Sequence, residues 1–502
     1  MSRGERLLET LRRLLRPDDD MADRTVTGGV WVTINNLADR ILQLATVLVL
    51  AQLIGPAAFG LFGIALLVQS ALKRLTKLGL NSALIQHREE NVDTYLDTVW
   101  TVELARGLVL GAVLYLSAPL VSSLFGDPRV TDLLRVFALL PVLGGLQNPG
   151  VVYFVKELEF HRDVAYKLSS RVVYVLVGLG VGYATRSVWA LVFAMLAGRV
   201  ASLVVSYLIH PYRPRPRFDR DAATELFGYG KWIFGSEGLS FLINEGDDAF
   251  VGWALGPAAL GVYQLSYRLS NAPATEITHP IQRVLFPAYS RVQDDTESLR
   301  QGYFATVRVI TLLSFPASVG IAVVAPTFVP AVLGPAWTEM IVPMQVFGVY
   351  AALRSFRSAT VPLFRAIDRP DYDTKIRVLK LALIIPFIYP ASQAFGVSGV
   401  ALVVLGHALV VAPIASYVAV RSVEGGMVTF GRILSYPAVG SVVMGIVVYA
   451  LRERIDGIPL VAELLLLMLT GVLVYGTVIL GLERQFGIGL DRLYRIVHEW
   501  AH

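Results

Sequence analysis

Segments of about twenty predominantly apolar residues recur along this chain from Gly28 onward, separated by short turns that hold glycine, proline and charged residues. A helix needs about twenty such residues to cross the hydrocarbon core of a bilayer, where its backbone polar groups must bond to one another. We count about fourteen segments of this kind, with no stretch between them long enough for a separate water-soluble domain. The predicted spans are 28–53, 58–79, 97–121, 131–153, 165–185, 187–210, 230–254, 258–280, 303–325, 340–364, 376–394, 397–420, 431–451 and 459–482.

The composition agrees with a membrane protein. Of the 502 residues, 55% are hydrophobic and 17% are charged, whereas about 25% charged residues are typical of soluble domains. The chain has no cysteine, which excludes disulfides, thiolate metal sites and cysteine nucleophiles. We therefore predict an all-α polytopic membrane protein that needs no cofactor.

Basic residues concentrate in alternate connections between the spans. Because cytoplasmic loops attract Lys and Arg, the basic set predicts an even number of spans with both termini cytoplasmic, in a cytoplasmic membrane. The cytoplasmic set in this count includes Arg24, Lys73, Arg74, Lys167, Arg171, the run RPRPRFDR at 213–220, Arg283, Arg291 and Arg365. The opposite set holds only Arg129, Arg186, Arg452 and Arg454. The basic run is read as a positive loop and not as a nucleic-acid patch, because it lacks interleaved aromatic residues.

The chain contains an internal duplication. LIGPAAFGLF at 53–62 returns as ALGPAALGVY at 254–263, so that Pro257 follows Pro56 by 201 residues, and the same offset relates Trp31 to Trp232. Six predicted spans separate the copies, which therefore enter the membrane in the same direction and form a parallel repeat. Each Gly-Pro pair is expected to end one helix and begin the next.

The predicted organisation follows from this repeat. It comprises a cytoplasmic amphipathic segment (1–24), an N-lobe of six helices (25–212), a C-lobe of six helices (213–425), two further helices (426–483) and an interfacial segment (484–502).

Several motifs resemble those of a known family. LIGPAAFGLFGIALLVQSALKRLTKLGLNSALIQ at 53–86, NEGDDAFVGWALGPAALGVYQLSYRL at 244–269, LFPAYSRVQDD at 285–295, KELEFHRD at 156–163, VWALV at 188–192 and RPRFD at 215–219 are similar to the Wzx-type polysaccharide and O-antigen flippases of the multidrug/oligosaccharidyl-lipid/polysaccharide exporter superfamily. The similarity covers most of residues 25–420. It implies two six-helix lobes plus two helices, and export by alternating access of glycans linked to a polyprenyl phosphate or pyrophosphate. It implies membrane lipids and other polysaccharide assembly proteins as partners, and no nucleic acid.

Ionisable residues inside the spans are candidates for the transport site, because each costs about 2.5 to 3.5 kcal/mol to insert. Asn36, Arg40 and Gln43 share one face of the first helix, with Asp39 adjacent. The YRL match places Arg268 where the resemblance implies a cavity arginine, with Asn271 one turn on; Arg199 is a further candidate. Arg40 and Arg268, one from each repeat, are expected to converge on a diphosphate, which arginine binds bidentately. Alternatively, Arg40 pairs with Asp39 or with a carboxylate of the seventh helix.

Carboxylates inside the predicted spans suggest a second function, the coupling of transport to an ion gradient. No phosphate-binding GxxxxGK[ST] loop is present for ATP, and uphill transport would need another energy source. Asp39, Glu245, Asp247 and Asp248 are the candidates for Na+ or H+ coupling. Relatives commonly carry Asp-Asn where this chain has Asp247-Asp248, so that ion handling is expected to differ.

Other polar residues in the spans receive structural interpretations. Glu103 and Arg106 are expected to form an intrahelical pair, Arg354 and Arg357 to reach toward lipid headgroups, and His407 to pack in the core. Two alternative functions remain open: a cation-coupled multidrug exporter of the same superfamily, or a membrane glycosyltransferase or polymerase. Such enzymes need acidic motifs on external loops. The longest external connection, near 326–339, has Glu339 as its single acidic residue and no basic residue. We predict a transporter and not an enzyme.

Overall fold

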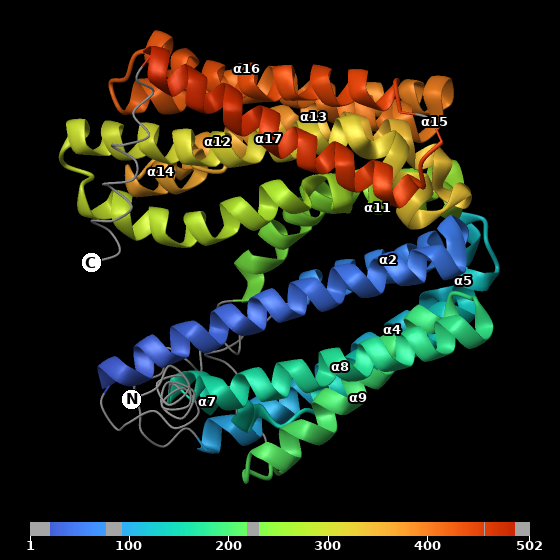
Figure 1. Cartoon of the computed structure of the whole chain (residues 1–502). Helices are drawn as coiled ribbons and strands as arrows, with labels where there is room; N and C mark the ends of the chain where they lie inside the picture. Colours follow the sequence, from blue (N-terminus) through green and yellow to red (C-terminus); the bar gives the residue numbers. More distant parts are fainter. Residues whose placement is uncertain (1–20, 77–92, 158, 218–229, 456, 487–502) are drawn as a thin grey trace, which may run out of the picture. The chain divides into compact units, whose positions relative to one another are not determined.

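The computed structural model describes residues 21–76, 93–157, 159–217, 230–455 and 457–486 (Figure 1). These residues are predominantly helical and hold no strand. Eight of the described helices are long and apolar enough to cross a membrane, and large apolar side chains such as Leu116 and Leu208 lie exposed on their surfaces. The chain is therefore an all-α multi-pass membrane protein, as predicted. The count of fourteen spans stays a prediction.

Three long helices are each made of two arms joined at a glycine. They are α2 (Met21–Leu75), α11 (Gly230–Arg291) and α15 (Pro370–Ser422), with non-helical backbone at Gly55, Gly256 and Gly396. Gly55 (φ 69°) and Gly256 (φ 85°) directly precede Pro56 and Pro257. A positive φ suits glycine, and proline fits the first turn of the next arm. The predicted role of both Gly-Pro pairs is confirmed.

The chain divides into two compact units, residues 1–258 and 259–502. This boundary lies within α11, next to the break at Gly256, whereas the predicted lobes are divided at 212/213, before α11. The predicted amphipathic segments 1–24 and 484–502 fall largely outside the described residues.

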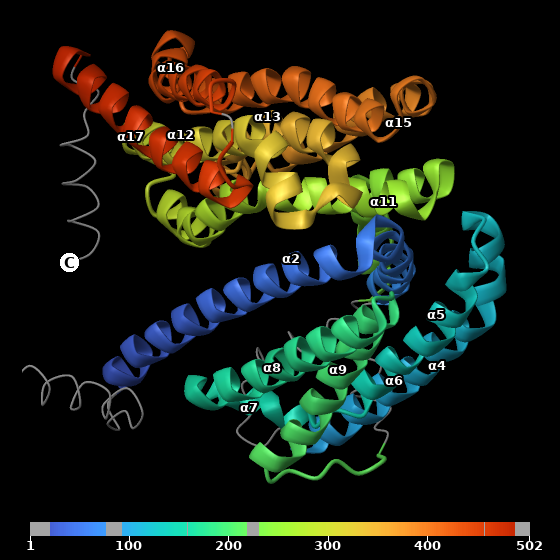
Figure 2. The ribbon, with the colours of Figure 1, turned by 45° about the vertical axis from the view of Figure 1, so that its right-hand side comes forward.

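The first unit is built around α2 and the long helices α4 (Asp93–Phe125), α8 (Phe160–Thr185) and α9 (Trp189–Ile209). Helix α8 packs along α9 and against α2, and Figure 2 shows α8 and α9 side by side. Between α4 and α8 the chain forms shorter elements: α5 (Arg129–Phe137), α6 (Leu139–Gly145), the 3-10 turn η1 (Pro149–Val151) and α7 (Val152–Lys156). The span predicted at 131–153 is therefore a broken helix.

Helix α6 lies unusually close to α4. A methyl group added at Gly145 would come within 2.5 Å of the carbonyl oxygen of Glu103, and one at Gly107 would come within 2.5 Å of Pro141 O. Small residues of this kind let two helix backbones approach in a membrane. This contact fixes Glu103 on α4 relative to α6.

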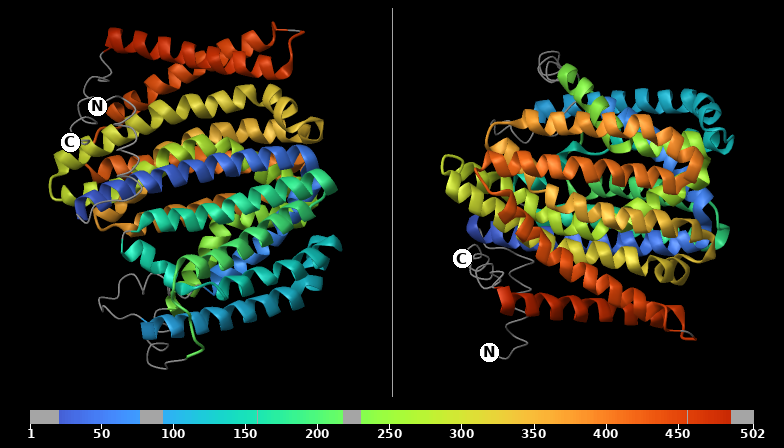
Figure 3. Two further views of the ribbon diagram at one scale, coloured as in Figure 1. Left: turned by 60° about the horizontal axis from the view of Figure 1, so that its bottom comes forward. Right: turned by 90° about the horizontal axis from the view of Figure 1, so that it is seen from above.

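In the second unit, α12 (Thr296–Phe328) packs against α13 (Ile341–Arg357), α16 (Met427–Arg452) and α17 (Leu460–Phe486). Between α12 and α13 lie the π turn η2 (Val329–Leu333) and the 3-10 helix η3 (Pro335–Met340), and α14 (Thr360–Ala366) follows α13. The core includes the fully buried Tyr303, Leu363 and Ala415. Figure 3 shows α16 and α17 together, and they share a cluster around Met444 and Leu467.

Candidate functional site

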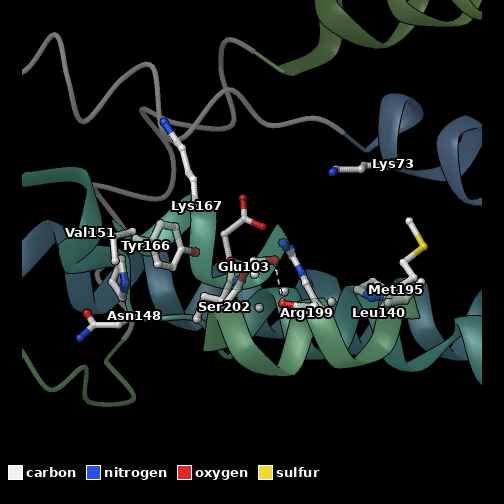
Figure 4. Close-up of a pocket in the computed structure, with 18 of the residues that line it drawn as sticks. Lys73, Glu103, Leu140, Asn148, Val151, Tyr166, Lys167, Met195, Arg199 and Ser202 are labelled. Carbon is white, nitrogen blue, oxygen red and sulfur yellow. Dashed lines mark hydrogen bonds between the residues drawn. The ribbon is translucent and has the colours of Figure 1, made fainter. Parts of the chain in front are cut away.

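A cavity of about 1020 Å³ lies inside the first unit, among α2, α4, α6, η1, α8 and α9 (Figure 4). Its volume is at the upper end of the usual range for small-molecule sites, about 300 to 1,000 Å³. Aromatic side chains of α4 and α8 contribute to its wall, namely Trp100, Tyr166 and Tyr174. The cavity therefore has room for a bulky ligand and offers it both flat apolar surfaces and polar groups.

The lining of the cavity carries more positive than negative charge. Five cationic side chains and three carboxylates line it: Lys73, Arg106, Lys167, Arg171 and Arg199, with Asp39, Glu103 and Asp163. Each carboxylate forms an ion pair with one of the cations. Two of the five cations are then left without a carboxylate partner among the described residues.

Asp39 joins α2 to α8. Its carboxylate accepts two hydrogen bonds from Arg171, from Nε at 2.5 Å and from Nη2 at 3.1 Å. One turn away on α8, the Lys167 ammonium lies 2.5 Å from Asp163 Oδ2. Asp39, predicted as a coupling carboxylate, thus pairs with Arg171 of α8. The alternative that Arg40 pairs with Asp39 or with a carboxylate of the seventh helix stays a prediction.

Arg106 is held at three points. Its Nη1 donates to both oxygens of Glu103, at 3.2 and 2.9 Å, its Nε donates to Thr76 Oγ1 at 3.2 Å, and its Nη2 donates to the Lys73 carbonyl at 3.3 Å. The predicted Glu103–Arg106 pair is confirmed. Arg106 also bonds to Lys73 O and Thr76 Oγ1 at the end of α2, so it links α4 to α2 in addition to forming the intrahelical pair.

Lys73 and Arg199 are the two remaining cations. Within the described parts of the chain, neither side chain forms a hydrogen bond or ion pair, although both lie within electrostatic range of Glu103. The Arg199 guanidinium packs against Gly144, where an added methyl group would come within 2.5 Å of Nη2. In Figure 4, the side chains of Lys73, Glu103 and Arg199 surround the same part of the cavity. This part of the cavity therefore carries an excess of positive charge.

Residues 210–217, which we call the strap, follow α9 and lie against the cavity's wall. The Tyr212 hydroxyl donates to Asp97 Oδ1 at 2.5 Å, and the Arg215 N–H donates to the same oxygen at 2.8 Å. The cavity-lining Asn148, fully buried, donates from Nδ2 to Tyr212 O at 2.7 Å. The described part of the run predicted as a positive loop, 213–217, is thus also bonded to α4.

Of the candidate residues predicted on the first helix, some line the cavity and others do not. Asp39 lines the cavity, whereas Arg40 and Gln43, both partly buried, do not. The side chain of Asn36 lies outside the described residues. The expected convergence of Arg40 with Arg268 stays a prediction.

Two carboxylates of α11 pair with Arg74 of α2 within the first unit. Glu245 accepts a hydrogen bond from Arg74 Nη2 at 2.8 Å, and Glu237 lies 3.7 Å from Arg74 Nη1. Asp247 and Asp248 are partly buried and also interact with neighbouring groups. None of these α11 carboxylates lines the cavity.

In the second unit, Arg268 is exposed on α11, whereas Asn271 is buried. Asn271 accepts a hydrogen bond from Arg354 Nη1 at 3.1 Å and donates one to Tyr267 O at 2.9 Å. The expectation that Arg354 reaches toward lipid headgroups is wrong, because its guanidinium bonds inside the helix bundle. His407 is buried and packs against Tyr350, as expected.

Sequence reasoning found Arg199 but missed Lys73, Lys167 and Arg171 as cavity residues, because it assigned them to cytoplasmic connections. A signal was nevertheless present. Asp163, Lys167 and Arg171 recur every fourth residue, which places them on one face of a helix. All three line the cavity.

Comparison with known proteins places the chain in a family. Residues 49–342 match a family model described as "Polysaccharide biosynthesis protein". The lipopolysaccharide biosynthesis protein WzxC of Escherichia coli (strain K12) is 28% identical over 388 residues, which are 76% of this chain and 78% of that protein. The succinoglycan biosynthesis transport protein ExoT of Rhizobium meliloti (strain 1021) is 25% identical over 317 residues, which are 62% of this chain and 64% of that protein.

Solved structures share the fold at lower sequence identity. The lipid II flippase MurJ, in an inward closed conformation, matches with a TM-score of 0.71 and 13% identity over 90% of this chain and 98% of its own. An inward-facing multidrug resistance MATE family transporter of the MOP superfamily matches with a TM-score of 0.61 and 16% identity over 79% of this chain and 98% of its own. Because the family model covers more than half of the residues, this chain belongs to the polysaccharide biosynthesis protein family that its sequence motifs resemble.

Proposed function

We propose that the chain is a flippase that translocates a lipid-linked oligosaccharide, joined to its polyprenyl carrier by phosphate or pyrophosphate, from the cytoplasmic to the outer leaflet of a cytoplasmic membrane. It moves its substrate without making or breaking a covalent bond. The family supports this function, as do relatives named for lipopolysaccharide biosynthesis and succinoglycan transport. The fold supports it too, because it is shared with a lipid II flippase.

The observation that carries the proposal is the pair of cations left over in the cavity, Lys73 and Arg199. A partly buried charge such as that of Arg199 is costly unless it is paired, whereas Lys73 is exposed in the last turn of α2. Three cations of the cavity have a carboxylate partner, and these two have none among the described residues. A phosphate or diphosphate would supply the missing negative charge, and an arginine fork binds its oxygens through charge-assisted hydrogen bonds.

The rest of the cavity suits the glycan of such a substrate. Trp100, Tyr166 and Tyr174 present flat apolar faces on which sugar rings can pack, and Ser170 and Ser202 add hydroxyl groups. Amphipathic cations, the substrates of the alternative multidrug exporter, would meet a lining with an excess of positive charge. The MATE likeness is one of fold, as is the likeness to the lipid II flippase, and it keeps that alternative open.

We extend the proposal to the topology and to the remaining predicted residues. Fourteen spans, arranged as two parallel six-helix repeats plus two helices with both termini cytoplasmic, fit the equivalent breaks at Gly55 and Gly256. Substrate-contacting roles for Arg40, Asn36, Gln43, Arg268 and Asn271 belong to other steps of the transport cycle in this proposal. Coupling to Na+ or H+ through Asp39, Glu245, Asp247 or Asp248 is an independent part of it.

Translocation in proteoliposomes tests the function. The purified full-length chain is reconstituted with a fluorescent polyprenyl diphosphate oligosaccharide, and exposure of the glycan on the opposite leaflet is measured over time. Arg199→Ala and Lys73→Ala are expected to lower the initial rate by roughly 10- to 100-fold each, because each removes a charge-assisted contact of about 1.5 to 3 kcal/mol. Arg199→Lys is expected to retain part of the rate, since it keeps the charge but loses the fork.

The matched control is Arg135→Ala, which removes a cation of the same unit that stacks on Tyr115 and does not line the cavity. Its rate should equal that of the unchanged protein. A cationic dye is assayed in parallel under the same ion gradients. Dye movement without glycan movement would overturn the proposed function. Normal glycan translocation rates in both alanine variants would show that this cavity is not the substrate site.

A further inference from the structure

Glu103 occupies a distinctive place in the cavity of the first unit. Its carboxylate bonds to Arg106 and lies within electrostatic range of Lys73 and Arg199, the two cations without an ion-pair partner. The charges around it come from three helices, α2, α4 and α9, with Tyr166 of α8 beside Arg199. Glu103 is therefore the negative charge at the centre of the cationic part of the cavity.

The two members of the Glu103–Arg106 pair are fastened unequally. Arg106 has two further hydrogen bonds, to Thr76 Oγ1 and to the Lys73 carbonyl, which hold its guanidinium against the end of α2. In the described part of the chain, Arg106 is the sole hydrogen-bond donor to the Glu103 carboxylate. The side chain of Glu103 is also the more exposed of the two, 30% against 17%. Glu103 can thus leave while Arg106 stays in place.

An anionic ligand and an ionised Glu103 compete for the same positive field. Two negative charges about 5 Å apart repel by a few kcal/mol at the effective dielectric constant of a partly solvated site. A phosphate that bonds to Arg199 and Lys73 is therefore opposed by Glu103 as long as that carboxylate remains where it is.

We propose that Glu103 is a displaceable internal counterion. It pairs with Arg106 and offsets part of the positive charge of Lys73 and Arg199 while the cavity is empty, yields this position to the phosphate of the substrate, and returns to help expel the substrate on the other side of the cycle. This inference rests on the proposed function, and it assigns to Glu103 a role in setting affinity and release. Arg106, kept in place by its other bonds, becomes a third ligand of the phosphate once Glu103 has moved.

Two measurements on the full-length protein in nanodiscs test the inference. The probe is a short-chain polyprenyl diphosphate N-acetylglucosamine, and its equilibrium affinity is compared with the translocation rate of the same variant in proteoliposomes. Glu103→Gln and Glu103→Ala are expected to bind the probe roughly tenfold more tightly, because the repulsion is gone. Their maximal translocation rates are expected to fall, because release is slower. Glu103→Asp should behave like the unchanged protein.

Glu159→Gln is the matched control, because Glu159 also pairs with an arginine three residues on, Arg162, but does not line the cavity. Its probe affinity should change less than twofold. Two substitutions of Glu103 are used so that the test still stands if one variant misfolds, and a melting curve of each variant verifies its fold. A purely structural Glu103 would lower stability and weaken binding in both variants, which would overturn the inference.

Arg199→Ala separates this inference from the proposed function. If Arg199→Ala weakens probe binding while both Glu103 variants bind no more tightly than the unchanged protein, the counterion role is wrong and the phosphate site stands. If Arg199→Ala, Lys73→Ala and the Glu103 variants all bind the probe like the unchanged protein, the cavity is not the phosphate site and both proposals fall. Tighter binding with unchanged maximal rate would overturn the role in release.

Discussion

Arg354 donates a hydrogen bond from Nη1 to Asn271 Oδ1 at 3.1 Å, which ties α13 to α11 within the second unit. Asn271 is 3% exposed and also donates to Tyr267 O, so that both ends of its amide are in use. The second acceptor near Arg354, Thr275 Oγ1, is 3.5 Å away. This geometry gives Asn271 a clear structural function, beside the substrate contact proposed for it.

Replacement of Asn271 distinguishes these two functions. Asn271→Leu leaves the Arg354 cation without its best acceptor and should lower the free energy of unfolding by about 1.5 to 3 kcal/mol. Asn271→Asp keeps an acceptor and should retain stability. Melting temperatures in detergent measure the first effect, and translocation rates measure the second. Loss of transport at unchanged melting temperature in Asn271→Leu would instead favour direct contact with the substrate.

The close approach of α6 to α4 makes a second prediction. In Gly145→Ala the new methyl group meets Glu103 O at about 2.5 Å, so the two helices must separate, at a cost of about 1 to 3 kcal/mol. Gly180→Ala on α8 is the matched control, because nothing lies within 4 Å of a methyl group there. The control should be neutral or stabilising, since alanine favours a helix over glycine. Equal melting temperatures for the two variants would contradict this packing.

Much of the fold could be predicted because its signals lie along the chain. The repeated Gly-Pro pairs predicted the breaks that the structure shows at Gly55 and Gly256, and the turn between the spans 376–394 and 397–420 coincides with the break at Gly396. The spans predicted at 131–153 and 340–364 proved to be broken helices. A hydropathy pattern averages over about twenty residues and does not register a break within an apolar segment.

The site was harder to predict because the position of a charged residue in the sequence does not show which way its side chain points. The enrichment of Lys and Arg in cytoplasmic loops was used to assign Lys73, Lys167 and Arg171. That rule does not distinguish a loop residue from one that faces a cavity near the end of a helix. Arg40 was chosen because it shares one face of the first helix with Asn36 and Gln43, whereas the adjacent Asp39 is the residue that lines the cavity of the first unit. Adjacent residues on a helix point about 100° apart, so Asp39 and Arg40 face different surroundings.

The absence of cysteine from the chain allows the topology to be tested without a background of reactive thiols. Thr185, at the end of α8, is predicted to face the outside, and Gln293, between α11 and α12, is predicted to face the cytoplasm; both are exposed. In intact cells, a membrane-impermeant maleimide should label Thr185→Cys and leave Gln293→Cys unlabelled until the membrane is permeabilised. The reverse pattern would invert the proposed orientation, and labelling of both in intact cells would contradict the span count between them.

His210 follows α9 and begins the strap. Its ring stacks on Tyr153, with centroids 5.7 Å apart, and its Nδ1 accepts a hydrogen bond from the Tyr212 N–H at 3.2 Å. Burial lowers the pKa of His210 below its ordinary value of 6.5, and Nδ1 can accept this bond only in the neutral ring. We therefore expect neutral His210 to hold the strap in place.

The sign of the pH effect follows from this lowered pKa. The unfolded chain binds the proton more readily than the folded chain, so the contribution of neutral His210 to stability is complete above about pH 6.5 and is lost as the pH falls from there through the folded pKa. The loss should stay below about 1 kcal/mol, because the ring is partly exposed and solvent screens its charge. Melting temperatures of the full-length protein between pH 8 and pH 5 measure it.

A pair of substitutions isolates His210 from the other groups that titrate over the same range. In His210→Asn, the side-chain oxygen can take the place of Nδ1 as acceptor without binding a proton, so the melting temperature at pH 8 should be nearly unchanged and its decline toward pH 5 should be shallower. His161→Asn, on α8, should keep the decline of the unchanged protein. If His210→Asn shows the same decline as His161→Asn, protonation of His210 does not loosen the strap, and the fall in stability belongs to the carboxylates.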